Sequence, residues 1–391
     1  MESEPNLTSS LEDRLPPIIY FLGRMVLFLA LIPDSYAGPG DLPFYQSWAA
    51  LPGWPYFHYW SEFPPLFPWL NAGLYKLAGG QQFIYYLLIA MLLALAGSAS
   101  LVVFRRIAGQ LWDPSQSRLR TWVYLGLLLP LPYTWWYFDL LPLAFMLLGT
   151  LWLVEGRSWR SGLAIGLGIL LKWFPALLLA SAWRFRRPGW AGRATAAALG
   201  LVAGVLAIVT LVSPQMSLAS LKGQVSRSSW ETAWALLDGN LTTGTFLKVG
   251  DRLDPSIAGL SYGKPAQISP YLTLAVFGGL GAWLFYRASS QTNLAQVAFL
   301  GLTWIVFLAW SPGWSPQWIL YLIPLTLLTL PFQAAFYGVG GIILLALIEW
   351  PTLLAHAFFE GLWIIVPLRL ALFAWLGFRW YCLACISVNR T

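Results

Sequence analysis

Long apolar segments alternate along the chain with short breaks that are rich in charge, proline or glycine. A helix that crosses a bilayer needs about 20 predominantly apolar residues, and the pattern supplies about twelve crossings if the interrupted run at 162–183 counts as two. The predicted spans cover residues 16–32, 83–104, 122–132, 134–154, 162–183, 194–212, 270–286, 294–310, 318–330, 336–350 and 362–378. This pattern predicts an all-α polytopic membrane protein that forms a single membrane domain over residues 1–391.

The apolar run at 162–183 is interrupted near its middle by Lys172 and Pro175 in the sequence KWFP, and arginines flank both of its ends. A single kinked span would place these two ends on opposite sides of the membrane. Two short helices that meet at Lys172 would keep both ends on one side. Irregular backbone at membrane depth is stable only where protein covers it or where it lines a water-filled space. We therefore expect two half-length helices with KWFP at the floor of an outward-open cavity.

Two segments outside the predicted spans are long and rich in aromatic and acidic residues. The first outer loop covers about residues 33–80 and places Glu62 just before the diproline of SEFPP, which favours extended backbone and directs Glu62 towards the cavity. The second outer loop covers about residues 213–269 and contains RSSWETAWALLDGNLTTG. Its tryptophans and leucines predict an amphipathic helix on the membrane surface. We expect re-entrant or interfacial helices in both loops.

Composition excludes an ordinary soluble domain. The chain is 58% hydrophobic and 10% charged, with a mean hydropathy of +0.64, whereas soluble domains carry about 25% charged residues. Its two cysteines, Cys382 and Cys385, cannot form the disulfide framework of a small secreted protein. Lipid is therefore the expected surroundings of most of the chain.

The placement of basic residues predicts the orientation in the membrane. In this topology most arginines fall on one side and all five lysines fall on the other. Because Lys and Arg are enriched in short cytoplasmic loops, the arginine-rich side is expected to be cytoplasmic. Both termini would then be cytoplasmic and both long loops would face outward, in a multi-pass protein of the plasma membrane. The net charge of +7 is explained by this topology, and no nucleic-acid partner is predicted.

Six short motifs follow one another over residues 33–331: GDLPFYQSW, SEFPPLFPWL, YFDLLPLAFMLLG, LLKWFPALLL, SWETAWALLDGN and WSPGWSPQWILYLIPL. With them the chain resembles the GT-C superfamily of membrane glycosyltransferases. The resemblance is to the polyprenyl-phosphate-dependent branch, which includes bacterial lipid-linked mannosyltransferases and relatives of the GPI mannosyltransferase. It implies a GT-C-like bundle that transfers a hexose, with mannose expected, from a polyprenyl phosphate to a lipid or glycan acceptor. The transfer would invert the anomeric centre and take place on the outer face.

Glycosyl transfer needs a base on the attacking hydroxyl and positive charge beside the departing phosphate. By the resemblance, the catalytic base is the carboxylate that follows the first span, which is Asp41 here, although aspartate is also common in turns such as PGD. Glu62 is the second candidate for the catalytic base. Asp139 lies at the outward end of its span, where it either orients an acceptor hydroxyl or caps a helix.

The expected substrate-binding residues include two cations. Lys172 is the first candidate for the phosphate, unless it extends to the interface, and Arg369 is the second, unless it only pairs with Glu349 or Glu360. Gln317 offers both a hydrogen-bond donor and an acceptor to a sugar hydroxyl. Three further residues lie in the KWFP and SWETAW motifs and complete the set: Trp173, Trp230 and Glu231.

No cofactor is predicted, although a divalent metal is possible. Some relatives carry an Asp-x-Asp pair in the first loop, whereas Asp41 stands here between Gly40 and Leu42, and a metal needs several oxygen ligands. Two alternative functions stay open. A transporter or flippase for lipid-linked sugars would show discontinuous helices in both halves, and only one interrupted segment is visible. An oligosaccharide ligase or polymerase would differ in its acceptor and not in its topology.

Overall fold

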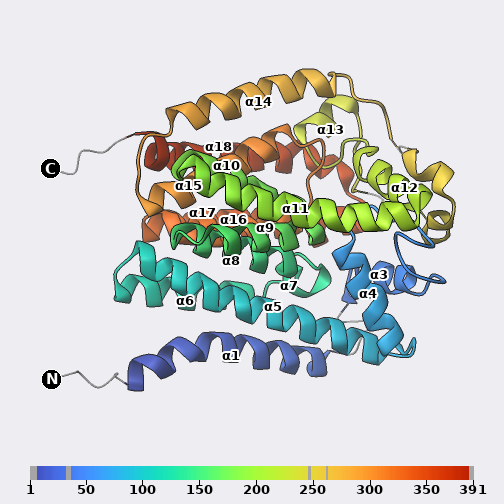
Figure 1. The fold of residues 1–391 in the computed structure, drawn as a ribbon, viewed down its shortest axis with the longest axis horizontal. Coiled ribbons are helices and arrows are strands. Elements are labelled where there is room, and N and C mark those ends of the chain that lie inside the picture. The colour runs from blue at the N-terminus through green and yellow to red at the C-terminus, as the bar shows by residue number, and fades with distance from the viewer. Residues whose placement is uncertain (1–6, 32–36, 245–247, 261–262, 387–391) are drawn as a thin grey trace.

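A computed structural model of the protein describes residues 7–31, 37–244, 248–260 and 263–386. All regular elements in this part of the chain are helices, and most of them run along the long axis of one bundle (Figure 1). The bundle helices are α1 (Leu7–Ala30), α5 (Gln82–Leu111), α6 (Pro114–Leu128), α8 (Leu140–Val154), α9 (Ser158–Leu171), α10 (Leu178–Phe185), α11 (Pro188–Val212), α14 (Pro270–Arg287), α15 (Asn293–Trp310), α16 (Ile319–Thr329), α17 (Phe332–Leu347) and α18 (Leu362–Cys385).

Shorter elements connect these helices and cover one end of the bundle. Among the α-helices they are α3 (Leu42–Ala49), α4 (Leu66–Leu77), α7 (Tyr133–Trp136), α12 (Pro214–Val225) and α13 (Ala233–Asp238). The 3₁₀ and π turns are η1 (Phe174–Leu177), η2 (Val249–Leu253), η3 (Pro255–Gly259), η4 (Pro316–Trp318), η5 (Ile348–Leu353), η6 (Leu354–His356) and η7 (Phe359–Gly361). We call the end at which α3, α4 and α12 gather the loop end; α1 begins and α18 ends at the opposite end (Figure 1).

Five helical stretches of the described residues are long and apolar enough to cross a membrane, which confirms an all-α membrane protein. They are Gln82–Leu111, Pro188–Val212, Asn293–Trp310, Phe332–His356 and Phe359–Cys385. The predicted count of about twelve transmembrane helices is not confirmed, because several apolar segments form shorter helices. One example is the predicted span at 134–154, which is divided between α7 and α8 by the extended residue Tyr137.

The predicted break at Lys172 is present. Helix α9 ends at Leu171, Lys172 is extended with φ −160° and ψ 140°, and the chain returns through η1 and α10. Arg186, just after α10, donates a hydrogen bond to the Val154 carbonyl at the end of α8 (3.0 Å), and Arg193 donates to Ser158 at the start of α9 (3.3 Å). The two open ends of the α9–α10 pair therefore lie at the same end of the bundle, as expected for two half-length helices.

Buried arginines satisfy the carbonyl groups that helix C-termini leave without intrahelical partners. Arg24 of α1 donates to the Leu129 carbonyl at the end of α6 (3.2 Å) and lies over the ring of Trp135. Arg120 of α6 donates to the Leu330 carbonyl after α16 (2.9 Å). These contacts explain why the bundle contains buried arginines, because each guanidinium replaces the water that the carbonyl groups at a helix C-terminus would otherwise bind.

The two predicted outer loops form one continuous layer at the loop end. The backbone N–H of Trp60 donates to the Arg252 carbonyl (3.0 Å), and its indole N–H donates to the Asp254 carbonyl (2.9 Å). The backbone N–H of Ser61 donates to the Ser220 hydroxyl (3.0 Å). Residues 33–36 of the first predicted loop lie outside the described residues. The layer places side chains of both loops next to the break between α9 and α10.

Candidate active site

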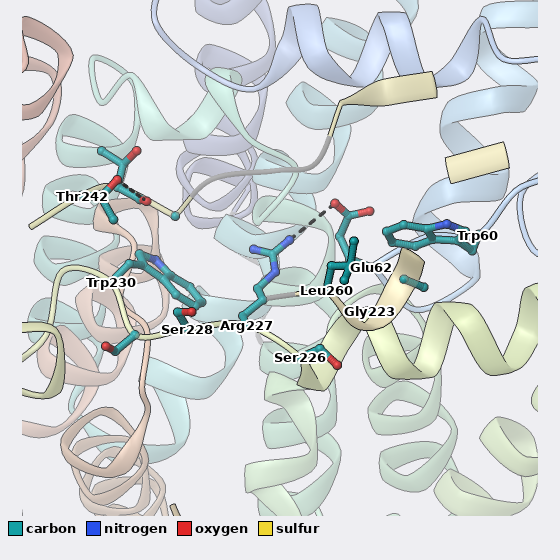
Figure 2. Close-up of a pocket in the computed structure, with 13 residues that line it drawn as sticks. Trp60, Glu62, Gly223, Ser226, Arg227, Ser228, Trp230, Thr242 and Leu260 are labelled. Atoms are coloured by element: carbon teal, nitrogen blue, oxygen red, sulfur yellow. Dashed lines mark hydrogen bonds and ion pairs between the residues drawn. The ribbon is translucent and has the colours of Figure 1, made fainter. Parts of the chain in front are cut away.

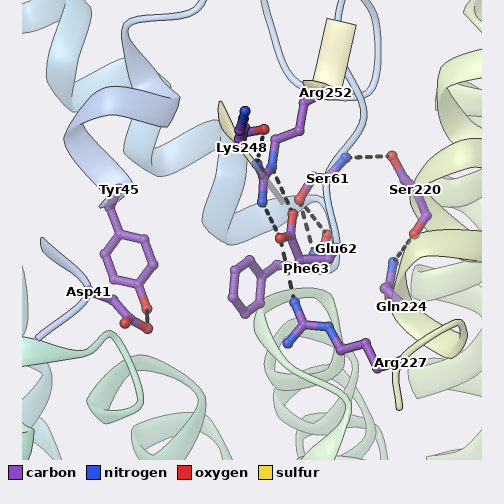
Figure 3. Close-up of polar contacts among 10 residues, drawn as sticks. All are labelled: Asp41, Tyr45, Ser61, Glu62, Phe63, Ser220, Gln224, Arg227, Lys248 and Arg252. Atoms are coloured by element: carbon purple, nitrogen blue, oxygen red, sulfur yellow. Dashed lines mark hydrogen bonds and ion pairs between the residues drawn. The ribbon is translucent and has the colours of Figure 1, made fainter. Parts of the chain in front are cut away.

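Asp41 lies at the start of α3, held from two sides. Its backbone N–H donates to the Trp136 carbonyl (3.1 Å), and its carboxylate accepts a hydrogen bond from the Tyr45 hydroxyl one turn later (3.0 Å; Figure 3). Tyr45 is fixed in turn, because Asn71 of α4 donates its amide to the Tyr45 carbonyl (2.8 Å). Packed elements therefore set the direction of this carboxylate.

The pKa of Asp41 suits a group that exchanges protons near neutral pH. The packed protein around the Asp41 carboxylate excludes water, and this burial raises its pKa to about 7. The Tyr45 hydrogen bond and the positive charges of Lys172 and Arg227 lower the pKa, while the Asp139 charge raises it. The structure thus brings Asp41 within electrostatic reach of two predicted site residues, Asp139 and Lys172, and of Arg227.

Asp139 and Lys172 form an ion pair at the break between the short helices. The Lys172 ammonium lies 2.6 Å from Asp139 Oδ1, which also accepts a hydrogen bond from the Tyr321 hydroxyl (3.0 Å). Asp139 occupies the N-cap position of α8, but its side chain makes no cap hydrogen bond to that helix. The Lys172 side chain is only 12% exposed and lies near the rings of Phe138 and Phe174.

Glu62 is held by two arginines of the second outer loop (Figure 3). Arg252 binds both carboxylate oxygens, with Nε 3.0 Å from Oε2, and Arg227 lies 3.5 Å from Oε1. Because guanidinium groups occupy its proton-accepting oxygens, Glu62 is a weaker candidate for the catalytic base than Asp41. Sequence analysis missed both arginines as site residues. The only signal was the position of Arg227 just before the SWETAW motif.

Arg369 pairs with Glu349, one of the two carboxylate partners expected for this arginine. Its guanidinium binds the Glu349 carboxylate, donates to the Glu231 carbonyl and lies 4.6 Å from the centre of the Trp314 ring. Glu231 itself adopts a left-handed backbone with φ 53° and is buried. Burial raises the pKa of its carboxyl group well above the usual range, and Oε2 has no hydrogen-bond partner in the described structure.

A small cavity opens in the loop-end layer beside Glu62 and Arg227 (Figure 2). Its volume is about 50 Å³, and it extends between the indoles of Trp60 and Trp230. The Trp230 ring is fixed between Gly244 and Gly313, where an added Cβ would lie 2.7 Å and 2.1 Å from ring atoms. Trp230 therefore packs inward, because only glycine on both sides leaves room for its ring.

Two other predicted residues, Trp173 and Gln317, lie apart from this cavity. Trp173 is 41% exposed and donates its indole N–H to Gln224 of α12. Gln317 is partly exposed in η4, next to Trp318, whose ring centre lies 5.7 Å from the Lys172 ammonium.

Within the described ranges, no group of three or more His, Cys, Asp and Glu side chains could hold a metal ion.

The bundle and the paired charges at its loop end define a membrane protein with a polar site at one end. The chain belongs to glycosyltransferase family 87, because the sequence model of that family matches residues 63–312, more than half of its length. The matched region contains Asp139, Lys172 and Arg227 and begins after Asp41. No curated protein and no solved structure matches the chain. The expected relation to membrane glycosyltransferases is thus confirmed and favours this class over a transporter.

Proposed function

We propose that the protein is an inverting glycosyltransferase of the GT-C type. It would transfer a hexose, with mannose as the first sugar to test, from a polyprenyl-phosphate donor to a lipid or glycan acceptor. The observation that carries this proposal is a buried carboxylate, Asp41, which Tyr45 and Trp136 hold in position within electrostatic reach of Lys172 and Arg227. A base for the attacking hydroxyl and cations for a departing phosphate are the two requirements of this reaction.

In the proposed reaction, Asp41 accepts the proton of the acceptor hydroxyl while that oxygen forms a bond to the anomeric carbon. The bond between the anomeric carbon and the phosphate oxygen breaks, and the phosphate leaves with one additional negative charge. The Asp139–Lys172 pair and Gln317 are proposed to orient sugar hydroxyls, with Trp173, Trp230 and Glu231 as further contacts. We propose no metal for this step, because side-chain cations can stabilise the leaving phosphate.

The proposed site faces outward at the plasma membrane, with both termini in the cytoplasm. Two observations support this orientation. Helix α1 begins and α18 ends at the same end of the bundle (Figure 1). Arg157 and Arg186, which the sequence places on the cytoplasmic side, lie near the shared end of α8 and α10.

Transfer of labelled mannose by the purified protein tests the proposal. We expect incorporation from a prenyl-phosphate mannose donor into membrane lipid acceptors, and the same rate when EDTA is present. Transfer from a nucleotide sugar alone would contradict the proposed donor. Loss of activity in EDTA, restored by a divalent cation, would contradict the metal-independent step.

The pH dependence of transfer should report the ionisation of Asp41. Because only the deprotonated carboxylate can accept a proton, kcat/KM should fall about tenfold per pH unit below pH about 7 and level off above it. Tyr45→Phe removes a hydrogen bond that lowers the pKa of Asp41, so the acid limb should move to higher pH. A profile measured between about pH 5 and 9 that is the same for both proteins would contradict the assignment.

Gly40→Ala should lower the turnover about a hundredfold. A Cβ at Gly40 would lie 2.3 Å from Trp136 Cβ and 2.9 Å from its Cα, so backbone must shift and Asp41 must move with it. The control is Gly73→Ala in α4, where an added Cβ has no neighbour within 4 Å. Steady-state rates of the two variants check the prediction, and equal activity would contradict the positional requirement.

A further inference from the structure

The cations of the site differ in how far their charges are neutralised by ion pairs among the described residues. Among the described ion pairs, Lys172 is the one cation that binds Asp139, and Arg369 is the one cation that binds Glu349. Arg227 and Arg252, in contrast, share the single carboxylate of Glu62. Two guanidinium groups thus face one carboxylate at Glu62. Lys172, the first candidate for the phosphate, is instead matched one to one with a carboxylate.

Exposure separates the two arginines that share Glu62. The side chain of Arg252 is 0% exposed, and the side chain of Arg227 is 28% exposed. Arg227 also lies on the wall of the cavity, with its guanidinium between Trp230 and Glu62 (Figure 2). Arg252 thus holds Glu62 from the buried side, and Arg227 is the cation that a ligand entering the cavity can reach.

The chemistry of the cavity suits a phosphate group. Its wall combines Arg227 with the hydroxyl-bearing residues Ser228, Thr242 and Thr243. Hydrogen bonds from a guanidinium to phosphate oxygens are strong and often bidentate. A volume of about 50 Å³ leaves room for one small anionic group, and it is too small to enclose a complete lipid-linked sugar.

Arg227 is also close enough to Asp41 for its charge to lower the pKa of that carboxyl group. During transfer, the acceptor proton neutralises Asp41 and the breaking anomeric bond leaves one more negative charge on the phosphate. One unit of negative charge therefore moves from Asp41 to the leaving group. A cation near both positions stabilises the charge before and after this movement.

We propose that Arg227 binds the phosphate of the lipid-linked donor in the cavity between Trp60 and Trp230, with Glu62 and Arg252 holding the guanidinium in position. This assignment rests on the proposed function. It names Arg227 as the phosphate-binding cation of that same site, in place of Lys172. Lys172 keeps its neutral pair with Asp139 and orients sugar hydroxyls.

Binding to the full-length protein in lipid nanodiscs tests the assignment with two probes, geranylgeranyl phosphate and geranylgeraniol, which share an apolar tail and differ in the phosphate. We expect the wild-type protein to prefer the phosphate, and Arg227→Ala to lose about 10- to 100-fold of that preference while binding of the alcohol is unchanged. Arg227→Lys should lie between them, because it keeps the charge and loses the planar fork. Arg157→Ala, which removes a 51%-exposed arginine elsewhere, is the matched control and should behave as wild type.

The outcomes separate this assignment from the proposed function. If Arg227→Ala keeps the full preference for the phosphate, the assignment to Arg227 is overturned and the proposed function stands. If the wild-type protein shows no preference, the prenyl-phosphate donor itself is overturned. Arg227→Gln replaces the alanine variant if that variant does not fold.

In the transfer assay, Arg227→Lys should raise the KM for the donor. A rise confined to the KM for the acceptor would show that the phosphate belongs to the acceptor lipid and would overturn the assignment.

Discussion

Asp41→Asn should lower the rate of sugar transfer about a thousandfold, the largest effect that we expect from any single substitution. Asparagine has nearly the same volume, and its carbonyl oxygen can still accept the Tyr45 hydrogen bond, so the fold is kept. Its amide cannot accept a proton from the acceptor hydroxyl at any pH. The prediction is checked by single-turnover transfer with saturating donor.

Asp254→Asn is the control for this substitution. Asp254 lies in the same outer layer, is exposed, and accepts a hydrogen bond from the Ser256 backbone N–H (2.9 Å), a role that asparagine can also fill. We expect wild-type activity from this variant. Transfer by Asp41→Asn at a rate comparable to that of Asp254→Asn would exclude Asp41 as the base.

Glu349→Ala should lower the free energy of unfolding by about 3–5 kcal/mol, the largest effect expected on stability. The substitution leaves the Arg369 guanidinium in α18 without the carboxylate that it binds, and Arg369 is only 5% exposed. It also removes the acceptor of the Trp314 indole N–H (3.1 Å). Unfolding in mixed micelles, followed by tryptophan fluorescence, measures this change.

The double variant Glu349→Leu with Arg369→Met distinguishes an unpaired charge from lost packing. Replacing both partners with apolar side chains removes the uncompensated charge, so most of the stability should return. A double variant that is no more stable than Glu349→Ala would show that the shape of the pair, and not its charge balance, stabilises this region.

The helical class and the main break in the fold could be predicted because their causes are local in sequence. Lys172 and Pro175 interrupt one apolar run, and arginines flank both of its ends, so periodicity and charge together indicated two half-length helices. The number of crossings could not be predicted in the same way. The extended residue Tyr137 divides a run that is continuous in composition, and the buried Asp139 that follows it is stabilised by Lys172 and Tyr321, which lie far away along the chain.

The pairing of Glu62 with Arg227 and Arg252 could not be predicted from the sequence, because these partners are far apart along the chain. Glu62 and Arg252 are separated by 190 positions, and no pattern in either loop connects them. Sequence reasoning therefore named Glu62 and missed the two arginines that hold it. It could name Asp41 because the resemblance placed a base just after the first span. The raised pKa that supports this choice comes from burial of the Asp41 carboxylate, which only the folded chain shows.

A cryo-EM structure of the protein with a non-transferable prenyl-phosphate sugar bound would test the central claim most directly. Our account predicts that the sugar lies in front of the Asp41 carboxylate at the loop end and that the phosphate oxygens contact the Arg227 guanidinium. A donor bound at the other end of the bundle, or one whose anomeric carbon is separated from Asp41 by packed helices, would contradict it.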